Sequence, residues 1–113
     1  GSRIISSVLQ VLVNVLANDM SLPEAMSAAR IHHQWYPDVL NVEVNVGAVR
    51  DDLIKKLSEM GHTIKVSEWG PSKRSRFGNL QAIHVDVRTG TVTGVSDPRG
   101  EGEPRGLDVN EAG

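Results

Sequence analysis

Residues 3–18 form the apolar segment that most constrains how this chain can fold. Its apolar side chains follow a helical stripe: Ile4, Ile5, Val8, Leu9, Leu12, Val15 and Leu16. Val11 and Val13 fall on the other side, so the predicted helix is apolar around nearly its whole circumference. A helix of this kind is normally buried on most faces. The β-branched residues also permit a buried strand, but the length of the segment favours a helix.

The next stretch carries a helix start signal. In Ser21-Leu22-Pro23-Glu24, the serine can cap the helix, and proline is tolerated in the first turn. Glu24 at the third helical position completes a capping box with Ser21. We expect this short helix to continue to about Arg30.

The remaining pattern predicts one more helix and several strands. Strict alternation over residues 41–46 indicates a strand with one buried face. A third helix is expected over Arg50–Met60, ended by Gly61. Further strands are expected at 63–66, 80–87 and 91–95, the last two joined by a hairpin turn at residues 88–90. We therefore predict an α/β (α+β) fold, with three helices packed on a mainly antiparallel sheet.

Composition limits the classes of function. The chain has 113 residues, which suits a single domain. Its net charge of -2 gives no electrostatic case for binding nucleic acid. With no cysteine, it has neither a disulfide nor a thiol nucleophile. The longest apolar run, Val8–Leu16, is too short to span a membrane, and no basic segment precedes it as in a signal peptide.

Two segments are irregular. Residues 70–78 form a basic loop that places Lys73, Arg74 and Arg76 beside Phe77. Such cations can contact phosphates, but on a chain of negative net charge they are more often solvated. Residues 100–113 are rich in glycine and acidic residues, so we predict a flexible tail after a structured part over residues 1–99.

The segment Ile31-His32-His33-Gln34-Trp35-Tyr36-Pro37-Asp38 invites a metal or catalytic interpretation. Adjacent residues on a strand point to opposite faces, so His32 and His33 cannot easily share one ion. His62 and His84 could join them only through the fold. We favour a structural role, with imidazoles hydrogen-bonded to backbone and the aromatic rings packed over a core edge. We expect the segment to hold the turn before the 42–46 strand.

Two acidic motifs also have structural explanations. Asp51-Asp52 at a helix start complements the helix dipole. Ser96-Asp97-Pro98-Arg99 offers a hydroxyl, a carboxylate and a guanidinium, but no adjacent base. An Asp97–Arg99 ion pair, or a pair between segments, is the ordinary interpretation. No phosphate loop, nucleophile elbow or zinc signature occurs, so the chain contains no complete active site.

Several of these motifs occur together in a recognisable order. They are Gly1-Ser2-Arg3-Ile4-Ile5, Ser21-Leu22-Pro23-Glu24-Ala25, Arg30-Ile31-His32-His33-Gln34-Trp35, Pro37-Asp38, Leu40, Val42-Glu43, Met60-Gly61-His62, Gln81-Ala82-Ile83 and Gly94-Val95-Ser96-Asp97-Pro98-Arg99. In this order, they closely resemble the C-terminal part of the small subunit of gamma-glutamyltransferases (gamma-glutamyltranspeptidases). The basic loop and the tail after Arg99 depart from that pattern.

The resemblance implies an N-terminal-nucleophile hydrolase with an αββα sandwich. Such a precursor cleaves itself, and its new N-terminal threonine attacks the gamma-glutamyl amide of glutathione or related compounds. The acyl group then passes to water, an amino acid or a peptide, without a cofactor or a metal. Family members are often exported to the periplasm or outside the cell. The implied partners are the remainder of the small subunit and the large subunit.

Little of the family's catalytic machinery falls on this chain. The threonine nucleophile would lie upstream, so we predict the chain alone to be inactive. Gly1 is either the second glycine of the family's oxyanion-hole pair or a residue contributed by a vector. The resemblance also implies that the neighbours of the apolar helix are missing from this chain, so we expect the chain to self-associate through that helix. A beta-lactam side-chain acylase of the same superfamily and a non-catalytic interaction module remain the alternatives.

Overall fold

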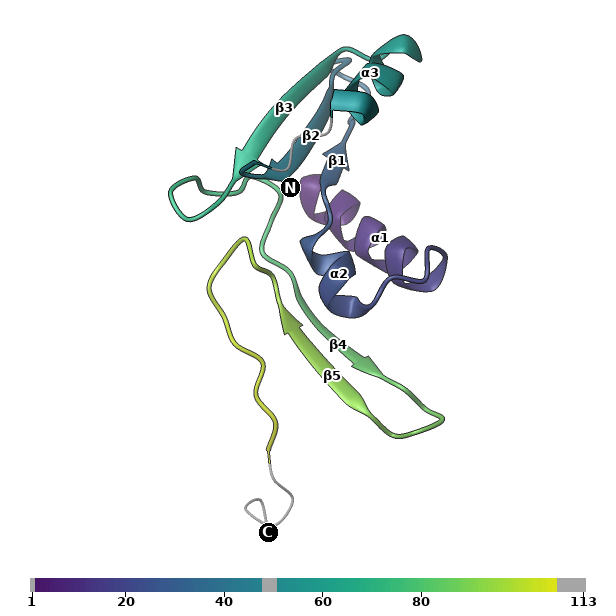
Figure 1. The fold of residues 1–113 in the computed structure, drawn as a ribbon, viewed down its shortest axis with the longest axis vertical. Helices are drawn as coiled ribbons and strands as arrows, with labels where there is room; N and C mark the ends of the chain where they lie inside the picture. Colours follow the sequence, from purple (N-terminus) through teal and green to yellow (C-terminus); the bar gives the residue numbers. More distant parts are fainter. Residues whose placement is uncertain (1, 48–50, 108–113) are drawn as a thin grey trace.

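The structure of the protein, a computed structural model, describes residues 2–47 and 51–107. Over these residues, two helices come first, and a third helix lies among the strands that follow (Figure 1). The helices are α1 (Ser2–Leu16), α2 (Leu22–Ser27) and α3 (Asp51–Glu59), and the strands are β1 (Arg30–His32), β2 (Leu40–Asn45), β3 (Ile64–Trp69), β4 (Gln81–Val85) and β5 (Val92–Ser96). The predicted mixed α/β class is confirmed. The predicted start of the third helix at Arg50 lies outside the described residues.

The strands divide into two sheets rather than one. β2 lies at the centre of the first sheet, antiparallel to β1 and parallel to β3. β4 and β5 form a separate antiparallel hairpin. β2 and β3 are parallel because α3 connects them: the chain crosses back along the sheet and enters β3 at the same end at which it entered β2. The pairings are therefore mainly antiparallel, as expected, with β2–β3 as the exception.

α1 and α2 lie at the junction of the two sheets (Figure 1). α1 contacts both α2 and β1, and α2 contacts β5. The predicted capping box at the start of α2 is confirmed. The Glu24 N–H donates to Oγ of Ser21 at 3.3 Å, and the Ser21 N–H donates to Oε2 of Glu24 at 3.3 Å. α2 ends at Ser27, before the predicted Arg30, which instead begins β1.

Two small apolar cores hold the elements together. One joins α1 to α2 and consists of Val11, Leu22, Ala25 and Met26. The hairpin closes this core with partly buried Leu80, Ala82 and Val95. The other consists of Leu40, Val42 and Val44 on β2, packed against Leu57 of α3 and Ile64 of β3.

One face of α1 is uncovered within the described chain. Only Ser7 and Val11 are buried on this helix. The exposed fraction is 73% for Ile5, 58% for Leu9 and 78% for Leu16. Within residues 2–47 and 51–107, α1 is therefore not buried on most of its faces, contrary to the prediction. In the same residues, the helices are too short or too polar to cross a bilayer.

Residues 101–107 run alongside the β4–β5 hairpin without regular secondary structure (Figure 1). Pro104 lies against Gly94, where an added Cβ would come within 2.9 Å of the proline Cβ. The absence of a side chain at Gly94 therefore permits this close approach. Residues 108–113 lie outside the described part, and the flexibility of the tail stays a prediction.

Candidate functional site

Four charged side chains, Arg30, Glu43, Asp97 and Arg99, form a buried ionic cluster where the two sheets meet. Nη1 of Arg30 lies 2.7 Å from Oδ2 of Asp97. Nε of Arg99 lies 3.1 Å from Oε1 of Glu43, and its Nη1 lies 3.4 Å from Oδ1 of Asp97. Each of these side chains is exposed by 1% or less. Two positive and two negative charges thus balance inside the fold, as buried charges require.

The arginines of the ionic cluster also close the C-terminal end of α2. The Met26 carbonyl accepts hydrogen bonds from Arg99 Nη1 at 2.8 Å and from Arg30 Nη2 at 3.2 Å. The Ala28 carbonyl accepts one from Arg99 Nη2 at 2.8 Å. The last carbonyls of a helix have no partner within it, so these guanidinium groups satisfy them.

The carboxylate of Glu43 anchors the basic loop. Its Oε1 accepts a hydrogen bond from the Ser75 hydroxyl at 2.6 Å. Its Oε2 accepts one from the Arg76 backbone N–H at 2.9 Å. The backbone around residues 75–76 is therefore fixed to β2 by a charge that the ionic cluster neutralises.

Phe77 links the ionic cluster to α1. Its ring is 1% exposed, and its carbonyl accepts hydrogen bonds from Arg30 Nη1 at 3.1 Å and from the buried Ser7 hydroxyl at 2.8 Å. The guanidinium of Arg3 lies 4.9 Å from the centre of the Phe77 ring, within range of a cation–π contact. Phe77 thus contacts α1 through both its carbonyl and its ring, and Arg3 Nη1 also donates to the Arg76 carbonyl at 3.5 Å.

The ionic cluster is suited to support rather than to catalysis. Burial lowers the pKa of the Arg30 guanidinium, the charge of Arg99 lowers it further, and the hydrogen bond to Asp97 opposes both effects. Oδ2 of Asp97 additionally accepts the Leu80 N–H at 2.9 Å. The carboxylates of Glu43 and Asp97 therefore both accept hydrogen bonds from donors of the fold, and neither is free to take a proton from a substrate. The predicted inter-segment ion pair is confirmed in this form.

His32 is buried against α1 and is bonded to side chains. Its Nδ1 lies 2.8 Å from Oγ of Ser6, and its Nε2 lies 3.0 Å from Oε1 of Gln34. With the Gln34 amide nitrogen donating to the Tyr36 carbonyl, Oε1 is left as an acceptor. This assigns the proton to Nε2, so Nδ1 accepts from Ser6. The predicted hydrogen bonds from backbone to the imidazole are wrong for His32.

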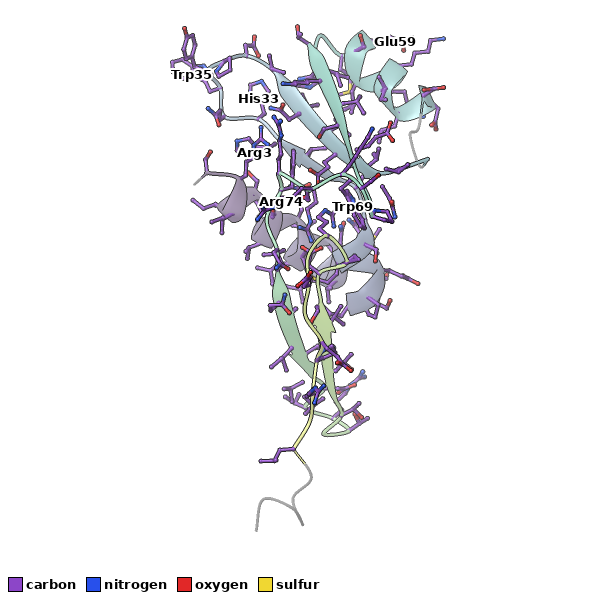
Figure 2. The ribbon with its side chains drawn as sticks, turned by 90° about the vertical axis from the view of Figure 1, so that its left-hand side faces the viewer. Arg3, His33, Trp35, Glu59, Trp69 and Arg74 are labelled. Atoms are coloured by element: carbon purple, nitrogen blue, oxygen red, sulfur yellow. The ribbon has the colours of Figure 1, made fainter. Side chains whose placement is uncertain are left out.

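The aromatic residues of the same segment point outward. Trp35 is 85% exposed and Tyr36 is 80% exposed. Figure 2 shows Trp35 at the edge of the molecule, directed away from the ribbon. The prediction that these rings pack over a core edge is wrong, because the turn between β1 and β2 carries them out of the sheet. The segment forms β1 and that turn, in which Trp35 has a φ of 72°.

The remaining histidines do not assemble a metal site. His33 contacts Asp38, with Nε2 and Oδ1 2.9 Å apart, and its ring centre lies 6.3 Å from that of His62. His84 lies on β4. Within residues 2–47 and 51–107, no group of three histidine or acidic side chains is arranged to hold a metal ion.

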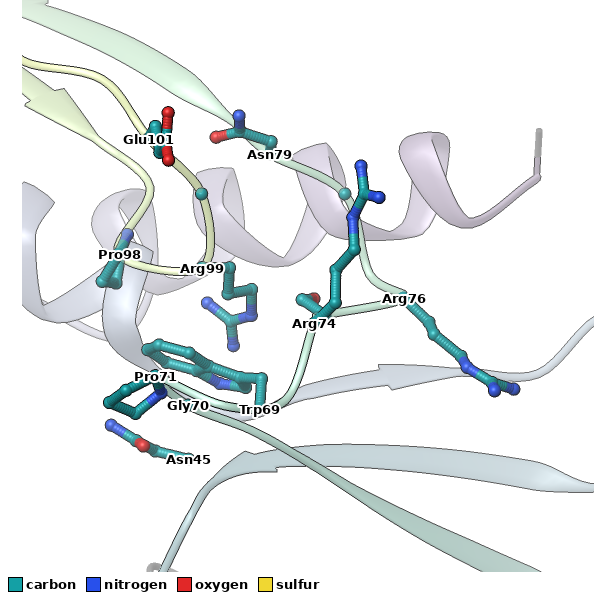
Figure 3. A pocket seen from close by; sticks show the side chains of 13 residues that line it. Asn45, Trp69, Gly70, Pro71, Arg74, Arg76, Asn79, Pro98, Arg99 and Glu101 are labelled. Carbon is teal, nitrogen blue, oxygen red and sulfur yellow. The ribbon is translucent and has the colours of Figure 1, made fainter.

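A cavity of about 1060 Å³ lies between the basic loop and the segment that follows β5 (Figure 3). Its lining includes Trp69, Pro71, Arg74, Asn79, Arg99 and Glu101. The guanidinium of Arg99 lies over the Trp69 indole, 4.8 Å from its centre. Because Arg99 belongs to the ionic cluster, the cavity lies next to that cluster.

Comparison with known proteins identifies the family. The family model for gamma-glutamyltranspeptidase matches residues 1–107. The chain belongs to the gamma-glutamyltranspeptidase family. It is 38% identical over 99 residues to the glutathione hydrolase proenzyme of Escherichia coli, a match that covers 88% of this chain and 15% of that protein. It is 33% identical over 102 residues to the Pseudomonas aeruginosa proenzyme, covering 90% of this chain and 17% of that one.

Solved gamma-glutamyltranspeptidases have the same fold. The Pseudomonas nitroreducens enzyme in complex with L-DON superposes with a TM-score of 0.77 at 32% identity, covering 96% of this chain and 52% of that one. An acivicin-inhibited gamma-glutamyltranspeptidase gives 0.72 at 39% identity, covering 89% and 50%. The chain thus spans about half of each solved chain and under a fifth of the proenzymes above.

The residues that carry the family resemblance build the ionic cluster. Arg30 precedes the paired histidines, Glu43 lies on β2, and Asp97 and Arg99 belong to the Ser-Asp-Pro-Arg motif. Of the ion pairs in this cluster, the sequence predicts only Asp97–Arg99 with both residues specified. Gly1, which the sequence resemblance predicts to be either an oxyanion-hole glycine or a vector residue, lies outside the described residues, so this prediction is not tested.

Proposed function

We propose that the protein to which this chain belongs transfers or hydrolyses gamma-glutamyl groups of glutathione and related compounds. A threonine outside this chain attacks the gamma-glutamyl carbonyl, and the amine of the donor leaves. Water or an acceptor amine then attacks the resulting ester and frees the threonine hydroxyl. The observation that carries the proposal is the match of the gamma-glutamyltranspeptidase family model to residues 1–107.

In this proposal, the chain positions one end of α1. Gly1 precedes Ser2, the first residue of that helix, and the resemblance assigns it to the oxyanion hole. Ser2 Oγ donates to Oε1 of Gln34 at 3.2 Å, and farther along α1 the Ser7 hydroxyl is bound to the Phe77 carbonyl. These contacts hold the helix against the turn that follows β1 and against the basic loop. Such support fixes catalytic groups to within fractions of an ångström.

The test compares this chain with the protein extended upstream through the proposed threonine. We expect the extended protein to release p-nitroaniline from gamma-glutamyl-p-nitroanilide, and its threonine-to-alanine variant to be inactive. A beta-lactam with an acidic side chain serves as the second substrate. Turnover of the beta-lactam alone would replace the proposal with the acylase. Turnover of neither substrate by a folded protein would favour a non-catalytic interaction module.

For the chain by itself, we propose self-association through α1. Ile5, Leu9, Leu12 and Leu16 recur at spacings of four and three residues and are all more than half exposed. This is the spacing at which two helices pack along one seam. Full burial of each such side chain would stabilise the associated state by about 1.5–3 kcal/mol.

Sedimentation of the chain tests this association. We expect a dimer or larger species at high concentration, and the double variant Leu9→Gln/Leu12→Gln should shift it to monomer. Val87→Gln, at a residue 90% exposed on the hairpin, is the matched control and should leave the distribution unchanged. A monomeric wild-type chain at high concentration would refute the proposal.

A further inference from the structure

The basic loop, residues 70–78, is the internal segment of the chain that departs from the family pattern, and the proposed reaction does not use its side chains. Its backbone is nevertheless well held. Gly70 and Lys73 exchange backbone hydrogen bonds of 3.0 and 3.1 Å. Glu43 accepts from Ser75 and from the Arg76 N–H, as described above. The loop therefore presents its side chains from a fixed backbone, which reduces the entropy lost on binding.

Two guanidinium groups of the basic loop are not used by the fold. Arg74 and Arg76 are exposed, and no hydrogen bond or ion pair engages either side chain within residues 2–47 and 51–107. Both line the cavity of about 1060 Å³. Figure 3 shows the Arg74 side chain extending toward the strand near Asn79, whereas that of Arg76 extends away on the other side. Arg74 is therefore the better placed of the two to hold a ligand in the cavity.

The rest of the cavity combines apolar walls with neutral polar groups. Trp69, Pro71 and Pro98 supply apolar surface, and the amide groups of Asn45 and Asn79 can donate and accept hydrogen bonds. The third arginine, Arg99, is already paired with Glu43 and Asp97. Among the described residues, Glu101 is the acidic residue in the lining, and it is exposed.

We propose that this cavity binds a small ligand through a free carboxylate, with Arg74 as the anchoring group. A guanidinium presents two parallel N–H donors that match the two oxygens of a carboxylate. The volume is far larger than a single ion needs and suits a small molecule. The apolar walls fit the side chain of an amino acid or the end of a short peptide. Arg76 adds positive potential at the mouth, and Glu101 opposes it.

Calorimetric titration with N-acetyl-leucine and with N-acetyl-leucinamide tests the proposal, because the two probes differ only in the carboxylate. The full protein that contains this chain is used, with Arg74 and Arg76 each replaced by glutamine in turn. We expect the acid to bind and the amide to bind at least about tenfold more weakly. Arg74→Gln should weaken binding of the acid by about tenfold, and Arg76→Gln by a few-fold.

Two further variants control for charge and folding. Glu101→Gln should tighten binding of the acid a few-fold, because it removes the opposing charge. Arg88→Gln, at the exposed hairpin turn outside the cavity, should leave the affinity unchanged. Equal binding of the acid and the amide, or no saturable binding at millimolar concentrations, would overturn the proposal. If inorganic phosphate binds more tightly than the acid, and Arg74→Gln abolishes that binding, the ligand group is a phosphate and not a carboxylate. The proposal is independent of the proposed reaction.

Discussion

Asp97→Asn is the substitution that probes the ionic cluster most sharply. The Asp97 carboxylate accepts from Arg30 Nη1 at 2.7 Å and from the Leu80 N–H at 2.9 Å through Oδ2. Oδ1 accepts from the Arg99 N–H at 3.0 Å and lies 3.4 Å from its Nη1. Asparagine keeps the shape of the side chain but removes its charge and turns one oxygen into a donor. Two buried guanidinium groups would then share one remaining carboxylate, that of Glu43.

The expected loss follows from burial. Removing one partner of a buried ion pair costs about 3–5 kcal/mol, since the charge left behind is uncompensated. Domains of this size are stable by roughly 5–15 kcal/mol. The two small apolar cores place this fold toward the lower end. We therefore expect the substitution to lower the melting temperature by roughly 12 °C or more.

Thermal and urea unfolding followed by circular dichroism measure this loss. Glu59→Gln is the matched control, because it removes a carboxylate that faces Lys55 at 4.0 Å on the exposed side of α3. Exposed pairs of this kind are worth about 0.5 kcal/mol or less. In a double-mutant cycle, Arg30→Met should partly relieve Asp97→Asn, with a coupling of at least about 1 kcal/mol. A cost for Asp97→Asn no larger than that of Glu59→Gln would refute this account of the cluster.

Three further substitutions test individual contacts, each by urea unfolding. Ser21→Ala removes the capping box of α2 and should cost about 1 kcal/mol, whereas Ser58→Ala on exposed α3 should cost much less; equal costs would contradict the capping role. Phe77→Ala empties a fully buried site and should cost about 3–5 kcal/mol, so a loss below 1 kcal/mol would be inconsistent with its burial. Ser6→Ala leaves Nδ1 of His32 without its partner and should cost about 1–3 kcal/mol; an unchanged midpoint would argue against a stabilising Ser6–His32 hydrogen bond.

The sequence predicted elements whose signals are local. The start of α2 was predictable because Ser21 and Glu24 make the capping box between themselves. α1 was predictable from its length and apolar stripe. β1 was not, because a strand of three residues is too short to show a period, and its stability comes from pairing with β2.

Contacts between distant segments could not be read from spacing. The alternation of β2 shows which face is apolar, but not that Glu43 on the other face is also buried or that β3 pairs with β2 in parallel. A buried arginine also looks the same in sequence as a solvated one, so the partners Arg30–Asp97 and Glu43–Arg99 appear only in the fold. The prediction that Trp35 packs against the core is wrong. Aromatic residues are usually buried, but here Trp35 has a positive φ in the turn after β1 and its side chain is exposed.

We propose that this chain supports a gamma-glutamyl enzyme whose nucleophile lies outside residues 1–113. Labelling the upstream-extended protein with a reactive glutamine analogue, followed by peptide mass spectrometry, identifies that nucleophile. We expect a single stoichiometric adduct on a threonine outside residues 1–113, and none when that threonine is alanine. An adduct on any residue within 1–113, formed in step with loss of activity, would contradict it.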